Sequence, residues 1–261
     1  VRSFEQWDGH PHAAQVLRRP LVDIERIGDA PAQVLAPLGT QESPLAGLRV
    51  LDLTRILAGP VAGRTLAAFG ADVMLVNSPR LPNIDAIAET SRGKLSTHVD
   101  LATEAGRDAL RGLVRECDVF LQGYRPGGLE ALGFRPQALA ALRPGIVSVS
   151  LSAYGELGPW WGRRGFDSLV QSATGMNVEE AAAFGVADPK PLPLQALDYG
   201  ALTVQIAGDF DDAMGREVPG EIGACRAGIT SRVWTYPLGG KDSERRSRHR
   251  RSAQARPMPV Q

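Results

Sequence analysis

The chain has 261 residues, 43% of them hydrophobic and 22% charged, which is typical of a globular protein and excludes a largely disordered chain or a coiled coil. Its 29 basic and 29 acidic side chains cancel, so the overall charge gives no reason to expect a nucleic-acid-binding protein. No apolar run reaches the roughly 18 residues of a membrane helix, and residues 1–8 lack the apolar segment of a signal peptide. We therefore expect a cytoplasmic protein that does not enter a membrane.

Metal and disulfide chemistry are also disfavoured by the composition. The chain has two cysteines, Cys117 and Cys225, and four histidines, three of which lie near its ends. These numbers and positions exclude a disulfide framework and a cysteine-based zinc site. We expect no metal ion in the functional site.

The chain divides into three regions with different sequence patterns. Five prolines between residues 11 and 44 are too closely spaced for long helices, so residues 1–44 are predicted to form an irregular arm with one short helix over 12–17. Residues 45–208 alternate between strand and helix patterns. Residues 209–261 lose this alternation and end in a stretch, 241–261, with seven Lys or Arg against two acids, which predicts a disordered basic tail.

The middle region has the β-α-β order of a doubly wound fold. Apolar and β-branched runs predict strands over 48–53, 72–76, 95–101, 119–122 and 146–151. Pro60 suits the first turn of a helix that Gly70 ends, and Thr103 suits the cap of a second helix. Short helical pieces are expected over 129–132 and 137–142. This pattern predicts an α/β protein with a Rossmann-like, doubly wound, largely parallel sheet.

Candidate ligand contacts lie in the loops that follow the predicted strands. The loop 54–60 leads into a helix and carries Arg55, so it can bind a phosphate through backbone amides and the guanidinium group. It lacks the glycine patterns of dinucleotide-binding and P-loop proteins, which disfavours an NAD enzyme. Arg92, Lys94 and Arg125 add positive charge in neighbouring loops. The alternative for each of these cations is an ordinary solvated surface residue.

Two aspartates stand before helical patterns, Asp167 within 165–168 and Asp198 within 194–200. From spacing alone each is predicted to be a helix N-cap, a position that Asp favours. The chemical alternative is attack by the carboxylate on an activated acyl group, which forms a covalent intermediate. Periodicity does not distinguish these two interpretations.

A series of segments along residues 44–206 carries a family resemblance. In order they are 44–55 (PLAGLRVLDLTR), 57–60 (LAGP), 69–73 (FGADV), 92–94 (RGK) with 99–101, 118–127 ending in YRPG, 151–159, and 165–175 beginning with GFD. Together they resemble the class III CoA-transferases, the family that includes the formyl-CoA and carnitine CoA-transferases and the α-methylacyl-CoA racemases.

The resemblance implies a Rossmann-like large domain that binds CoA or acyl-CoA as a substrate, with no permanently bound cofactor. Asp198 matches the family's catalytic aspartate, which forms an aspartyl anhydride and then an aspartyl-CoA thioester before a small carboxylic acid accepts the CoA. Family subunits interlock in pairs, so the implied partner is a second copy or a homologous chain. By the same resemblance the CoA nucleotide and phosphates contact Thr54, Arg55, Leu57, Ala58, Arg92, Lys94 and Arg125.

The racemase branch of the family is a less favoured alternative. In that branch a His precedes the aspartate that matches Asp167, whereas this chain has Phe166 there. No histidine occurs between His98 and His249. A two-base proton shuttle thus lacks one of its groups, and a transferase is favoured.

The chain also departs from the family pattern. An acidic residue usual after the second strand is absent from 74–79, and Gln122-Gly123 replaces a common Glu-Asn. The resemblance stops near Ala207, short of the family's usual length. We therefore expect a truncated or split member: an arm (1–44) that resembles the end of a preceding homologous half, a large CoA-binding domain (45–208), and an atypical tail (209–261) that would fit a shifted reading frame.

Two further hypotheses follow from these departures. The first is a catalytically inactive member that retains CoA binding or subunit association. The second, weaker one is contact between the basic tail and nucleic acid, but the tail has no aromatic residues among its charges and no recognisable module. We expect no nucleic-acid partner.

Overall fold

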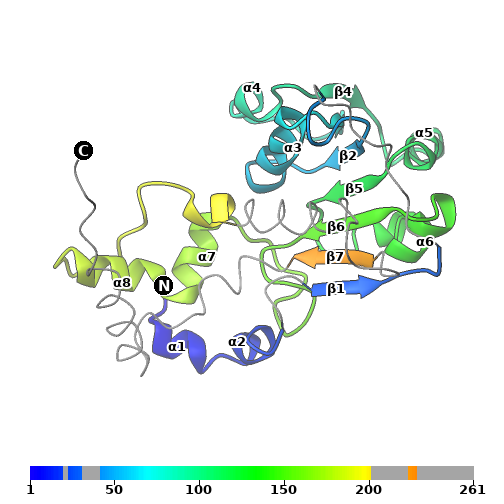
Figure 1. The fold of residues 1–261 in the computed structure, drawn as a ribbon. Helices are drawn as coiled ribbons and strands as arrows, with labels where there is room; N and C mark the ends of the chain where they lie inside the picture. The colour runs from blue at the N-terminus through cyan, green and yellow to red at the C-terminus, as the bar shows by residue number, and fades with distance from the viewer. Residues whose placement is uncertain (20–22, 31–41, 201–222, 228–261) are drawn as a thin grey trace, which may run out of the picture.

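The computed structural model describes residues 1–19, 23–30, 42–200 and 223–227, which form a seven-stranded sheet with helices on both faces (Figure 1). All neighbouring strands run parallel except the first two in the order, which are antiparallel. The predicted α/β fold with a largely parallel sheet is confirmed. In order across the sheet the strands are β1 (Asp23–Arg26), β7 (Gly223–Ala227), β6 (Val147–Leu151), β5 (Val119–Gln122), β2 (Arg49–Leu53), β3 (Asp72–Asn77) and β4 (Leu95–His98).

Helices connect the successive parallel strands, and local signals set their bounds. Gly70, with a φ of 99°, follows the end of the first of them, and the Thr103 hydroxyl accepts the Gly106 amide at the start of the longest. None of the helices within the described ranges is long and apolar enough to cross a membrane. The connecting helices are α3 (Ala58–Ala68), α4 (Ile87–Thr90), α5 (Glu104–Arg115), the 3₁₀ helix η1 (Glu130–Leu132) and α6 (Pro136–Leu142).

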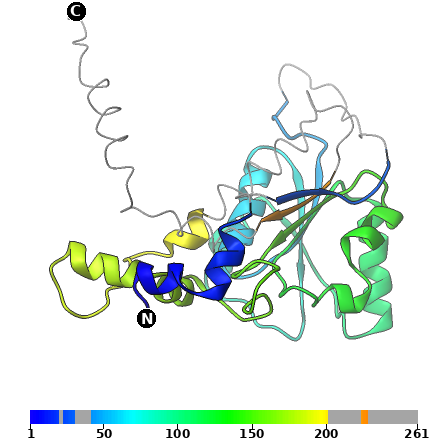
Figure 2. The same ribbon diagram turned by 90° about the horizontal axis from the view of Figure 1, so that it is seen from below.

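The sheet separates two hydrophobic clusters because successive side chains of a strand point to opposite faces. Val50 of β2 belongs to the cluster under α3 with Leu66, whereas Leu51 belongs to the cluster under α5 with Leu110. Figure 2 shows these layers, with cyan α3 on one side of the strands and the green helices on the other. Both faces are covered, so a ligand reaches the sheet at the ends of its strands.

The strand predicted over 95–101 is shorter than expected and ends at His98. The Val99 amide still donates to the Asn77 carbonyl, which continues the pairing with β3. At Asp100 the carbonyl instead accepts the Thr103 hydroxyl, and this bond turns the chain into α5. A capping interaction therefore ends the strand before its apolar pattern does.

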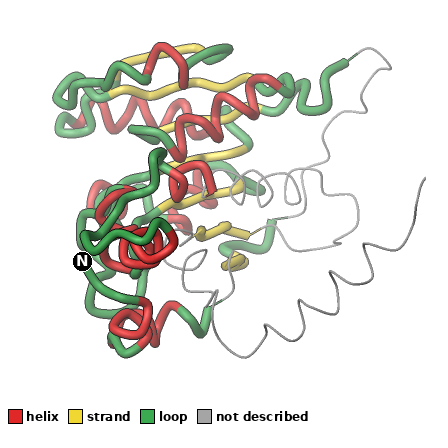
Figure 3. The backbone as a smooth tube through the Cα atoms, turned by 90° about the vertical axis from the view of Figure 1, so that its left-hand side faces the viewer, coloured by secondary structure: helices red, strands yellow, loops and turns green. Residues whose placement is uncertain are grey.

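Residues 1–44 are more regular than predicted. The short helix expected over 12–17 is α2 (Pro11–Val16), but α1 (Phe4–Asp8) precedes it and β1 joins the sheet. A capping box between Ser3 and Gln6 starts α1, a signal that is visible in the sequence. Figures 1 and 3 show these N-terminal helices beside α7 (Asp167–Thr174) and α8 (Met176–Ala183).

The contact between the arm and these helices is a third hydrophobic cluster. Trp7 and Ala13 are fully buried in it, and they pack against a set of buried side chains that includes Trp160 and Val170. His12 is also fully buried: its Nδ1 accepts the Trp160 amide, and its Nε2 donates to the Tyr154 carbonyl over 2.8 Å. Burial lowers the pKa of His12, in keeping with the neutral ring that this pair of bonds requires.

Part of the expected tail is ordered. Of residues 209–261 the structure describes only 223–227, and these form β7 between β1 and β6. The expectation of disorder throughout this region is wrong for these five residues, because backbone pairing on both sides builds them into the sheet. The rest of the predicted tail lies outside the described residues.

Candidate active site

The strand order locates the crevice where doubly wound folds bind ligands. From β2 the chain proceeds outward to β3 and β4, and it then crosses to β5 and β6 on the other side of β2. The connections thus diverge between β2 and β5, and ligands bind at the carboxyl ends of strands at such a point. The loops after these strands touch, since a Cβ atom built on Gly123 would lie 3.8 Å from the Thr54 Cβ. The crevice therefore brings together five of the predicted residues: Thr54, Arg55, Leu57, Ala58 and Arg125.

A buried network around Asp52 holds the turn from β2 into α3. The Asp52 carboxylate is fully buried and accepts both the amide and the hydroxyl of Thr54, at 2.9 and 2.5 Å. Two residues later Ile56 has a φ of 76°, in the left-handed region that β-branched residues avoid. Such a conformation costs about 1–3 kcal/mol and persists only where the surroundings impose it. Leu57 is the N-cap of α3 and Ala58 its first residue.

Lys94 belongs to this network and not to the open crevice. Its side chain is 0% exposed, and its Nζ donates to Asp52 Oδ2 over 2.6 Å and to the Pro60 carbonyl over 2.7 Å. The expectation that Lys94 contacts a CoA phosphate is corrected here, because a buried and paired ammonium presents no free charge to a ligand. The sequence signal for its partner is the carboxylate of Asp52 between Leu51 and Leu53 in a strand that is otherwise apolar from residue 50 onward.

The three predicted arginines remain on the surface. Arg55 is exposed and donates to the Pro82 carbonyl, and Arg125 is exposed in the loop after β5. Arg92 is 74% exposed and pairs with Glu89 over 3.1 Å. Their guanidinium groups are accessible to an anionic ligand. Arg55 also borders a small cleft, whose other lining residues are Thr54, Ile56, Pro60, Leu75, Asn77, Asn83, Ile84, Ile87 and Thr90.

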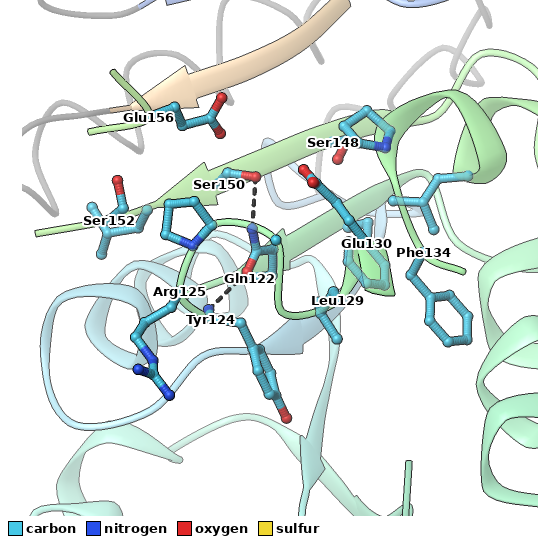
Figure 4. A pocket seen from close by; sticks show the side chains of 16 residues that line it. Gln122, Tyr124, Arg125, Leu129, Glu130, Phe134, Ser148, Ser150, Ser152 and Glu156 are labelled. Atoms are coloured by element: carbon cyan, nitrogen blue, oxygen red, sulfur yellow. Dashed lines mark hydrogen bonds between the residues drawn. The ribbon is translucent and has the colours of Figure 1, made fainter. Parts of the chain in front are cut away.

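A second pocket opens on the other side of β5, between this strand and β6 (Figure 4). Two hydrogen bonds of Gln122 fix one side of this pocket. Its Nε2 donates to Ser150 Oγ over 2.8 Å, and its Oε1 accepts from the Tyr124 amide over 2.7 Å. Gln122 is one of the departures from the family pattern noted above. In this chain it ties β5, β6 and the Arg125 loop together.

Asp198 and Asp167 are adjacent, but neither is the N-cap of its own helix. Helical structure begins at residue 196, so Asp198 lies in the first turn, and Phe166 is the N-cap of α7. Asp167 caps the other helix instead: its Oδ2 accepts the amides of Leu197 and Asp198, at 2.7 and 3.0 Å. Its Oδ1 accepts from Gln171. The two carboxylates are thus brought together across about 30 residues of sequence.

The electrostatics of this pair favour a reactive Asp198. Burial, and after it the negative charge of Asp167, raise the pKa of Asp198 to about 6. A carboxylate with that pKa is still mostly ionised at neutral pH, and it is a stronger nucleophile than an ordinary Asp because it is more basic. Asp167 is only 2% exposed and its oxygens are occupied by hydrogen bonds. Of the two groups, Asp198 is the one suited to attack.

The side chain before Asp167 contributes no second acid or base. Phe166 is 55% exposed and has no titratable group. The position that holds a His in the racemase branch is therefore apolar in this chain. The pair of titratable groups at this point consists of two carboxylates.

A comparison with known protein families identifies the family of the chain. The sequence model of CoA-transferase family III matches residues 45–191, more than half of the chain. The chain belongs to this family.

Two CoA-transferases are similar to the chain in sequence, and one of them also in fold. The probable fatty acyl-CoA transferase Rv3272 of Mycobacterium tuberculosis is 35% identical over 176 residues, which cover 62% of this chain and 44% of the relative. The succinate–glutarate CoA-transferase of Agrobacterium fabrum is 33% identical over 160 residues, which cover 54% of this chain and 40% of the relative. An orthorhombic crystal structure of Rv3272 superposes with a TM-score of 0.66 at 30% identity, over 82% of this chain and 60% of that one. This chain therefore spans less than half the length of these two curated relatives.

Proposed function

We propose that the chain carries the CoA-binding and nucleophile-bearing part of a CoA-transferase, which moves CoA from an acyl-CoA thioester to a small carboxylic acid. The observation that carries the proposal is the Asp198 carboxylate, with a pKa of about 6, beside the helix cap made by Asp167. Membership in the CoA-transferase family III and the activities of the relatives named above support it. The donor and acceptor acids are left open by the proposal.

The proposed reaction has four balanced steps. The Asp198 carboxylate attacks the thioester carbonyl and the C–S bond breaks. CoA departs as the thiolate, and a mixed anhydride remains on Asp198. The thiolate then attacks the aspartyl carbonyl, which releases the donor acid as a carboxylate and forms an aspartyl-CoA thioester. The acceptor carboxylate attacks this thioester, giving a second anhydride and free thiolate. Attack of the thiolate on the acceptor's carbonyl forms the new acyl-CoA and restores Asp198.

The CoA moiety is proposed to lie across the crevice between β2 and β5. Exposed guanidinium groups at Arg55, Arg92 and Arg125 suit its phosphates, and the backbone of Leu57 and Ala58 lies at the start of α3. Lys94 is left out of this set because it is buried and paired. No separate cofactor is needed for the four steps.

We further propose that the chain works in the cytoplasm in association with a second copy or a homologous chain. Eight of the large exposed apolar side chains of the described residues fall within residues 157–199, the stretch of sequence that holds both aspartates, and exposed apolar side chains of this kind favour association. The exposed side chains are Leu157, Trp161, Phe166, Leu169, Phe184, Val186, Leu194 and Tyr199.

A catalytically silent CoA-binding chain is the second candidate function, and the departures from the family pattern at residues 74–79 and at Gln122 favour it. The two candidates differ in what happens after CoA binds. Binding alone raises the melting temperature, because a ligand at a hundred times its dissociation constant stabilises the folded state by about 2.7 kcal/mol. Transfer in addition leaves a covalent adduct on Asp198.

The test is to incubate the full chain with a panel of acyl-CoA donors and carboxylic acids, and to record new acyl-CoA by chromatography and intact protein mass. We expect transfer and a CoA adduct with the natural chain, neither with Asp198→Ala, and both with the control Asp188→Ala, whose side chain is exposed. A CoA-dependent rise in melting temperature without transfer would support the silent candidate. If CoA neither raises the melting temperature nor is transferred, both candidate functions are refuted.

A further inference from the structure

The Asp52–Lys94 ion pair is built in a way that stability alone does not explain. Both side chains are 0% exposed, and their charges are 2.6 Å apart. Taking two charges out of water opposes most of what their attraction contributes, so a buried pair is weak evidence of a stabilising role. The family resemblance implies that Lys94 contacts a phosphate, but its buried and paired ammonium group is not available for that contact.

The pair closes a ring around the loop assigned to CoA. At one end Asp52 lies in β2 and accepts from the amide and hydroxyl of Thr54. At the other end Lys94 donates to the Pro60 carbonyl in the first turn of α3. The residues between these two anchors are 55–59, which include the left-handed Ile56. The hydrogen bonds of both charges therefore end on the two sides of the same turn.

Close packing of glycines on the pair prevents the ring from relaxing. A Cβ atom on Gly63 would lie 2.3 Å from Asp52 Oδ2 and 2.9 Å from Lys94 Nζ. A Cβ atom on Gly59 would lie 2.3 Å from the Thr54 Cβ. Helix α3 thus rests directly on the network, and its first turn cannot move away from β2 without breaking the bonds of Lys94.

We propose that Asp52 and Lys94 are positioning residues, which hold Ile56 in its left-handed conformation and thereby fix the backbone of Leu57 and Ala58 at the edge of the crevice where acyl-CoA binds. The inference rests on the proposed function, since it gives the pair a role in CoA binding without direct contact. In this arrangement the strain at Ile56 is balanced by the buried pair. If the pair is removed, the turn relaxes toward negative φ and the start of α3 no longer matches the ligand.

The experiment compares CoA affinity, measured by calorimetry on the full chain, among three variants. Asp52→Asn with Lys94→Met removes both charges together, so that no unpaired charge stays buried. The second variant adds Ile56→Gly, because glycine adopts positive φ without cost and does not need the clamp. The control is Asp118→Asn with Arg143→Met, which removes a mostly buried ion pair of 2.9 Å before the start of β5, at the other end of the strands.

We expect CoA affinity to fall about fivefold to 150-fold in the first variant, the range to which a strain of about 1–3 kcal/mol corresponds, and to remain unchanged in the control. Adding Ile56→Gly should recover most of the loss. A purely structural pair would lower the melting temperature without changing the affinity of the folded fraction, and glycine would give no rescue. Either of these results overturns the inference while the proposed function stands. Absence of CoA binding by the natural chain would overturn the proposed function and this inference with it.

Discussion

Replacement of Asp198 by Asn should make the chain more stable at neutral pH while it removes the proposed nucleophile. The folded chain holds this carboxylate beside Asp167, and its pKa rises from the ordinary 3.8 to about 6. One pKa unit corresponds to about 1.4 kcal/mol, so ionising this group opposes folding by about 3 kcal/mol at neutral pH. Since the side chain keeps partial contact with solvent, which screens its charge, we expect a gain of about 2 kcal/mol in the variant.

The sign of the effect sets its pH dependence. A carboxyl group whose pKa is higher in the folded than in the unfolded state binds more protons when folded, so it opposes folding increasingly as the pH rises from about 4 to about 6. The advantage of Asp198→Asn should therefore be full well above pH 6 and disappear below about pH 4, where the carboxyl group is protonated in both the folded and the unfolded chain.

Urea unfolding at pH 7.5 and pH 4.5, followed by circular dichroism, measures this difference. Asp188→Asn serves as the control, because it makes the same chemical change on an exposed side chain. A variant at Asp198 that is no more stable than the natural chain at pH 7.5, or whose gain is the same at both pH values, would refute the idea of a buried ionised carboxylate. It would also remove the main observation behind the nucleophile.

Three further predictions concern the neighbouring structure. Asp167→Asn should lower the pKa of Asp198, because it removes the like charge, and so shift the acid limb of the transfer rate to lower pH; an unchanged pH profile would contradict the coupling. Gly59→Ala should reduce stability by about 1–3 kcal/mol and weaken CoA binding, since its Cβ would lie 2.3 Å from the Thr54 side chain; thermal unfolding with and without CoA measures both. Trp7→Ala should cost about 3–5 kcal/mol in urea unfolding, and a cost below about 1 kcal/mol would show that the arm does not pack as described.

The parallel part of the fold could be predicted because its signals are local. Runs such as 119–122 and 147–151 are rich in apolar or β-branched residues, and caps such as Thr103 act within three residues. The edge strand β1 and its neighbour β7 were not predicted. They pair residues about 200 positions apart, and the sequence GACRA of β7 has no β-branched residue to mark it.

The site could be predicted by residue type but not by role. The resemblance named Asp198, and the loop after β2, from the sequence alone. It could not separate an exposed cation from a buried one, and so Arg55 and Lys94 received the same role although one is exposed and the other is enclosed. Nor could spacing show that Asp167 caps a helix that begins about 30 residues later. Both distinctions depend on contacts between distant parts of the chain.

The docking of the N-terminal arm has a consequence for where this protein can be cut. The family match starts at Leu45, which suggests a natural boundary there, but the arm in front of it fills the space beside α7 and α8. A shortened chain starting at Leu45 would expose Trp160, Val170 and Met176 to water, next to the helix that carries Asp167. Such a product is expected to aggregate. Expression designs, fusion tags and protease sites for this protein therefore belong ahead of Ser3, where the capping box begins.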